Sequence, residues 1–147
     1  MQPLRSTSPM DHPHPHTPEP DPVAVGSTFR VLLRGETVTH ELARADTMWR
    51  RMKGLLGRGG LDPSEGLWIE PCNSIHMFFM RFPIDAVFLD KGMQVVRVHE
   101  DLRPWRMARG GKFAHSVVEL PPGKAAFFNI RVGDRLQMVA NEARPPA

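Results

Sequence analysis

The fold is decided by residues 84–99, which read IDAVFLDKGMQVVRVH. Two runs rich in β-branched and aromatic residues, Ile84–Leu89 and Met93–His99, flank the turn sequence DKG at 90–92. Such residues favour strands, and Gly92 can supply the positive φ of a tight turn. The pattern predicts a β-hairpin, and with it a mainly β domain.

Strand signals of the same kind recur on both sides of this hairpin. They cover Phe29–Leu33, Thr37–Leu42, Gly66–Glu70, Ser74–Met80, Ser116–Leu120 and Arg135–Val139. Two short helices are predicted between them, one from Asp46 or Thr47 to Gly57 and one over Gly123–Asn129. The expected fold class is mainly β (α+β): a compact, largely antiparallel sheet or a partly open barrel with two short helices.

The length of 147 residues suits one domain. Residues 1–22 hold seven of the 15 prolines and little apolar sequence, which predicts a disordered Pro/His-rich leader. The domain is then expected over 23–141, with a frayed C-terminus over 142–147. The N-terminal residues lack the apolar core of a secretory signal peptide, and no stretch of the chain is apolar for long enough to form a membrane helix. We therefore expect a cytoplasmic protein without membrane insertion.

Composition narrows the function classes. The formal net charge is +3, with 15 Arg and 4 Lys, which is far below the charge density of a dedicated nucleic-acid binder. The single cysteine, Cys72, excludes an internal disulfide. The chain has no P-loop, dinucleotide fingerprint or serine-nucleophile elbow, and we assign it no cofactor.

The densest chemistry lies in residues 71–85, PCNSIHMFFMRFPID. Charge in such apolar surroundings is costly unless it is paired, which draws attention to Arg81 and Asp85. We hypothesise a binding module in which Arg81 offers a bidentate fork to a small polar or anionic ligand. Asp85 would orient Arg81 or the ligand, although a buried carboxylate that accepts backbone N–H bonds is the simpler reading.

Four further residues complete this hypothetical site. His76 and Phe78 belong to the same segment, and Phe78 and Trp105 would supply apolar walls. Trp105 lies in a basic loop over 99–115 that is expected to lack regular structure and to form a rim. Glu119 could pair with one of the loop arginines.

The alternative is a thiol- or metal-dependent enzyme centred on Cys72 and His76, with Asp85 as orienter. On an extended chain Cys72 and His76 would lie roughly 13 Å apart unless a turn brings them together. A zinc site would also need ligands from distant strands, so we assign no metal. Catalytic residues are left open.

Several ordered blocks resemble a known family. RMKGLLGR (51–58), EGLWI (65–69), PC (71–72), DAVFLD (85–90), VELPPG (118–123) and GDRL (133–136) are similar to the bacterial and archaeal "domain of unknown function 192" family. The resemblance covers roughly residues 28–139 and implies a small, mainly β domain with short helices. It implies no reaction, substrate or cofactor. Some branches have an aromatic-Met-Lys pattern at Phe79-Met80-Arg81, so a shared function would rest on Met80, a base at 81 and Asp85 rather than on the thiol.

Overall fold

The computed structural model describes residues 28–45, 55 and 58–142. Nine strands and one short helix are formed within these ranges. The strands are β1 (Thr28–Leu33), β2 (Glu36–Ala45), β3 (Glu65–Ile69), β4 (Ser74–His76), β5 (Ile84–Leu89), β6 (Val95–Leu102), β7 (Met107–Arg109), β8 (Ser116–Leu120) and β9 (Leu136–Ala140), and the helix is α2 (Lys124–Phe127).

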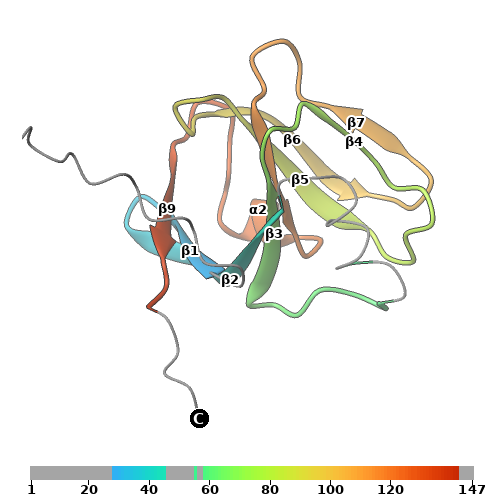
Figure 1. Ribbon diagram of the computed structural model, residues 1–147, viewed down its shortest axis with the longest axis horizontal. Coiled ribbons are helices and arrows are strands. Elements are labelled where there is room, and N and C mark those ends of the chain that lie inside the picture. Colours follow the sequence, from blue (N-terminus) through green and yellow to red (C-terminus); the bar gives the residue numbers. More distant parts are fainter. Residues whose placement is uncertain (1–27, 46–54, 56–57, 143–147) are drawn as a thin grey trace, which may run out of the picture.

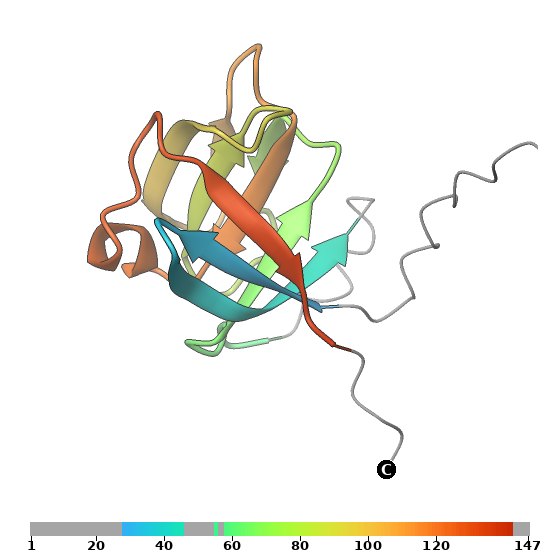
Figure 2. The same cartoon turned by 90° about the vertical axis from the view of Figure 1, so that its left-hand side faces the viewer.

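Seven of these strands form one sheet in the order β6-β5-β8-β3-β2-β1-β9. Every pairing in it is antiparallel except the parallel pair β2–β3. The sheet curls so that its two edge strands approach at one corner, where Gln94 and Arg135 form an isolated bridge (Figures 1 and 2). Leu136 N–H also donates to Met93 O there. The expected mainly β fold, with a partly open barrel, is therefore confirmed.

β4 and β7 form a separate two-stranded ribbon. Figure 1 places this ribbon at the end of the molecule opposite to β1 and β9. One apolar cluster, which includes Leu42, Val87 and Leu120, fills the inside of the curled sheet, and a second, which includes Ile75, Met77 and Phe88, joins the ribbon to the sheet. Both clusters use β5, because all six of its residues are buried.

The hairpin at 84–99 is confirmed, with a different turn residue in the left-handed region. Asp90 Oδ1 accepts hydrogen bonds from the N–H groups of Gly92 and Gln94, which fixes the turn. The positive φ, 66°, belongs to Met93 and not to Gly92.

The two predicted helices and the predicted loop over 99–115 have different outcomes. The helix expected over 46–57 lies outside the described residues except for Leu55, which is buried. The helix expected at 123–129 is confirmed as α2, with Gly123 before it at φ 89°. The prediction of an unstructured loop over 99–115 is wrong, because β6 continues to Leu102 and residues 107–109 pair with β4 as β7.

The predicted leader, 1–22, and the C-terminal residues 143–147 lie outside the described part of the chain. Within the described residues, no helix is both long and apolar enough to cross a membrane.

Candidate functional site

The β4–β7 ribbon brings two distant segments of the chain together. His76 of β4 pairs with Met107 of β7. Beyond this pair the backbone of Met77 continues the contact, because its N–H donates to Arg106 O at 2.7 Å and its carbonyl accepts from Trp105 N–H at 2.8 Å. The loop after β4 and the loop before β7 are therefore fixed to each other.

This pairing gathers four rings, which we call the aromatic surface: His76, Phe78, Phe79 and Trp105. The imidazole of His76 stacks on Phe78 with ring centroids 4.7 Å apart and planes at 26°. Phe78 and Phe79 each contact Trp105, with centroid separations of 6.0 and 5.0 Å. The rings thus form a continuous row across the two loops.

The aromatic surface faces solvent. Phe78 is 38% exposed, Phe79 63% and Trp105 60%, and the neighbouring Met107 is 59% exposed. Isolated exposed apolar residues are ordinary on proteins, whereas a contiguous group of large ones is a candidate for a binding site. The row of rings is such a group.

Two of these rings stand on strained backbone. Phe79 has φ 64° and Trp105 has φ 66°, in the left-handed region that bulky residues rarely adopt. Each such residue costs of order 1–3 kcal/mol and persists only where its surroundings enforce it. Here Met77 O accepts from Trp105 N–H and from Met80 N–H, the residue after Phe79, so both strained positions lie beside fixed backbone.

Arginines adjoin the aromatic surface in the sequence. Arg81 is exposed and makes no hydrogen bond or ion pair within the described residues. Arg103 makes one long contact, 3.6 Å from its Nε to Asp101 Oδ2, between two exposed side chains. Such an exposed pair stabilises little, so both guanidinium groups can bind an anion.

Asp85 is placed away from this surface. Its side chain is completely buried. Oδ1 accepts from Asp101 N–H and Oδ2 from Ala125 N–H, both at 2.9 Å. The carboxyl group therefore joins β5 to the end of β6 and to α2, and no ion pair connects it to the exposed Arg81.

Glu119 is also completely buried, on β8 opposite Leu67 and Ala86. Among the six residues of the predicted site, the structure thus brings His76, Phe78 and Trp105 into contact and leaves Arg81 exposed close to them in the chain. Asp85 and Glu119 are interior residues.

Sequence reasoning missed Phe79. The alternation of residues 74–80 predicts that Ile75, Met77 and Phe79 share one face of a strand, opposite to the face of Phe78. Instead the strand ends at His76 and the chain turns, so that Met80 takes the buried position and Phe79 is exposed. Pro83 signals a bend in this region, but it does not locate the bend at Phe79.

In the alternative enzyme site, Cys72 precedes β4 and His76 is the last residue of that strand. Cys72 is half-buried, and its Sγ donates to Ser74 O at 3.2 Å. His76 stacks on Phe78. In the described ranges, no group of three or more His, Cys, Asp or Glu residues is placed to hold a metal ion.

Comparisons with known proteins agree on the family. The DUF192 family, described as Uncharacterized ACR, matches residues 30–138. A UPF0127 protein of Thermococcus sibiricus is 34% identical over 121 residues, which are 76% of this chain and 74% of that protein. A UPF0127 protein of Pyrococcus furiosus is 33% identical over 110 residues, 71% of this chain and 91% of that protein.

Two solved structures have the same fold. A protein of unknown function from Novosphingobium aromaticivorans matches with a TM-score of 0.61 and 24% identity, over 75% of this chain and 83% of its own. A structure described as a putative transcription regulator from Sinorhizobium meliloti matches with a TM-score of 0.63 and 21% identity, over 76% of this chain and 92% of its own.

Proposed function

We propose that this chain, which belongs to the DUF192 family of uncharacterised proteins, is a ligand-binding module that holds a flat, anionic small molecule on the aromatic surface. The observation that carries the proposal is the exposed row of His76, Phe78, Phe79 and Trp105, two of them on strained backbone. A row of rings that the fold holds in solvent at a cost in free energy is suited to contact with a molecule from outside.

The chemistry of the surface indicates the ligand class. A planar group can stack on Trp105 or Phe78, because the faces of aromatic rings are attractive to other rings in an offset arrangement. An acidic group on the same molecule can accept two parallel hydrogen bonds from Arg81. Asp85 takes no part in this proposal, since both of its oxygens already accept backbone hydrogen bonds in the interior.

Calorimetric titration tests the proposal with two flat anions, 2-naphthoate and adenosine monophosphate. Trp105→Ala should weaken binding of the better probe roughly 5- to 150-fold, the equivalent of about 1–3 kcal/mol for one stacked ring. Arg81→Ala should weaken it by about tenfold, because one charge-assisted pair is lost. Neither change should lower the thermal stability, since both side chains are exposed.

Matched controls come from exposed residues outside the aromatic surface. Phe127→Ala removes an 81% exposed ring on α2, and Arg30→Ala removes an exposed arginine on β1. Both variants should bind like the wild-type chain. Equal effects of Trp105→Ala and Phe127→Ala, or no binding of either probe at millimolar concentration, would refute the proposal.

A second candidate, an accessory module that binds a partner protein, is favoured by one observation. Met107 extends the aromatic surface with a further exposed apolar side chain, and interfaces are enriched in aromatic residues, Met and Arg. A photocrosslinking amino acid at 107 should then yield one defined adduct in cells, and the same amino acid at 127 should not. Equal labelling at both positions would remove this candidate.

A further inference from the structure

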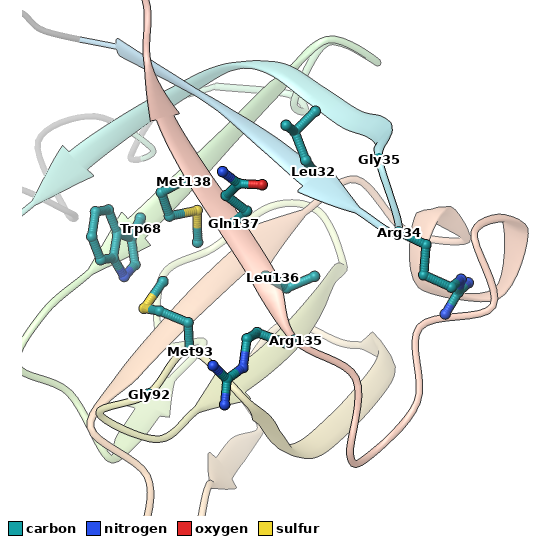
Figure 3. A pocket seen from close by; sticks show the side chains of 10 residues that line it. All are labelled: Leu32, Arg34, Gly35, Trp68, Gly92, Met93, Arg135, Leu136, Gln137 and Met138. Atoms are coloured by element: carbon teal, nitrogen blue, oxygen red, sulfur yellow. The ribbon is translucent and has the colours of Figure 1, made fainter.

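A hollow of about 550 Å³ lies at the opposite end of the molecule from the aromatic surface, beside the edge strand β9. Leu136 and Met138 of β9, Trp68 of β3 and Met93 of the β5–β6 turn contribute to its walls (Figure 3). Its volume is typical of sites for small molecules, and the walls are mainly apolar. We call it the β9 pocket.

Trp68 carries the observation that points to a ligand. The residue is 8% exposed, and its indole Nε1 is buried with no hydrogen-bond partner among the described residues. A buried indole N–H ordinarily has an acceptor, and a buried donor left unpaired destabilises the protein. An acceptor atom brought into the β9 pocket would remove this destabilisation.

The side chains around the indole can let such an acceptor in. Met93 and Met138 are half-buried and pack against the core cluster that contains Trp68. Methionine has three rotatable bonds and a polarisable sulfur, so it adapts to a ligand more readily than a branched side chain does. Figure 3 shows both thioethers grouped with the indole on one side of the pocket.

The pocket also has a cationic margin. Arg34 is engaged, because it pairs with Asp134 at 3.1 Å and donates to Phe128 O. Arg135 is exposed and makes no ion pair within the described ranges, while its backbone is fixed by the bridge to Gln94. A guanidinium group so placed is available to an anion.

We propose that the β9 pocket binds an apolar carboxylic acid that carries a second oxygen acceptor. The carboxylate pairs with Arg135, the apolar body lies against Leu136, Met93 and Met138, and the second oxygen accepts from the indole N–H of Trp68. This site is separate from the aromatic surface, and its ligand need not stack.

Three matched probes test each contact in turn. 4-Benzoylbenzoate has the carboxylate and a ketone oxygen, 4-benzylbenzoate replaces the ketone by a methylene group, and 4-benzoylbenzamide lacks the charge. Calorimetry should show that 4-benzoylbenzoate binds about tenfold more tightly than either, which corresponds to about 1.4 kcal/mol for each contact. In a nitrogen–proton correlation spectrum it should shift the indole signal of Trp68 and leave that of Trp105 in place.

Variants separate binding from folding. Trp68→Phe should abolish the difference between 4-benzoylbenzoate and 4-benzylbenzoate while still binding the second, which shows that the pocket is intact. Arg135→Ala should weaken both acids about tenfold and leave the carboxamide unchanged, whereas Arg30→Ala should change nothing.

The proposal is overturned if Trp68→Phe keeps the discrimination between the two acids, or if the wild-type chain binds none of the three probes at millimolar concentration. A shift of the Trp105 signal alone would also overturn it, and would assign the probe to the aromatic surface instead. Trp105→Ala should leave binding of 4-benzoylbenzoate unchanged, so the two sites can fail independently.

Discussion

Asp85 provides a sharp test of how the fold is held together. Its two oxygens accept from Asp101 N–H and Ala125 N–H, 16 and 40 residues away in the sequence. Asp101 sits at φ 50°, so the first of these bonds also secures a left-handed residue near the end of β6. Asp85→Asn keeps the shape of the side chain but leaves one acceptor oxygen where the wild type has two.

The cost of this substitution follows from the hydrogen bonds. One backbone donor keeps its partner, and the other faces the amide NH2, which cannot accept. Losing a hydrogen bond to a charged group and leaving a buried donor unpaired costs about 1.5–3 kcal/mol. With a urea m-value of roughly 1–3 kcal/mol per M, the unfolding midpoint should fall by about 0.5–3 M.

Asp90→Asn is the matched control. Both backbone bonds to Asp90, from Gly92 and Gln94, end on the same oxygen, Oδ1. An asparagine can accept both through its single carbonyl oxygen, so the cost should stay below about 0.5 kcal/mol. Urea unfolding that gives equal midpoints for Asp85→Asn and Asp90→Asn would refute the reasoning.

Three further predictions concern other parts of the chain. Gly110→Ala should destabilise the fold by about 1–3 kcal/mol in urea unfolding, because a Cβ there would meet Ala114 Cβ and lie 2.5 Å from Phe88 Cδ1. Gly59→Ala is the control and should cost less than about 1 kcal/mol, since a Cβ at that position has open space. Partial burial raises the pKa of Glu65, but hydrogen bonds from Arg58 and Asp62 N–H and the charge of Arg58 outweigh burial and leave the pKa below its usual 4.5. The stability that this lowered pKa contributes is present above pH 4.5 and is lost as the pH falls through the folded-state pKa. Glu65→Gln should therefore lower the melting temperature at pH 7 and make the melting temperature less sensitive to acid. An equal decrease of the melting temperature at pH 7 and at pH 3 would contradict this. Phe79→Gly should weaken probe binding at the aromatic surface without lowering the melting temperature, because glycine relieves the strain at φ 64° while the contact with Trp105 is lost; a clear loss of stability would show that Phe79 serves folding.

The elements that were predicted correctly are those whose geometry depends on residues close together in the sequence. The hairpin at 84–99 follows from two apolar strands and a turn whose Asp90 fixes the backbone within four residues. The helix α2 follows two prolines and a glycine. Such features need no knowledge of distant parts of the chain, and the sequence alone was sufficient for them.

The candidate site depends on contacts between residues that lie far apart in the sequence, which a local sequence pattern does not indicate. The positions of Phe79 and Trp105 are set by the pairing of β4 with β7 and by hydrogen bonds from Met77 to residues about 28 positions further on. Periodicity grouped Phe79 with the buried Ile75 and Met77 because it assumed that the strand continues past His76. The partners of Asp85 are backbone groups on two other elements, and no residue pattern identifies a backbone donor.

The backbone at Phe79 and Trp105 is part of the reason why we propose a binding role for the exposed rings. A left-handed position is relieved by glycine, so selection for stability alone would favour small residues at 79 and 105. The chain instead has Phe79 and Trp105 there, and each leaves more than half of its side chain in solvent. Their contact with each other returns about 0.5–1.5 kcal/mol, which is less than the 2–6 kcal/mol or so that two strained residues cost. Their mutual contact therefore does not offset the strain, and the proposed binding role gives a reason for large rings at these two positions.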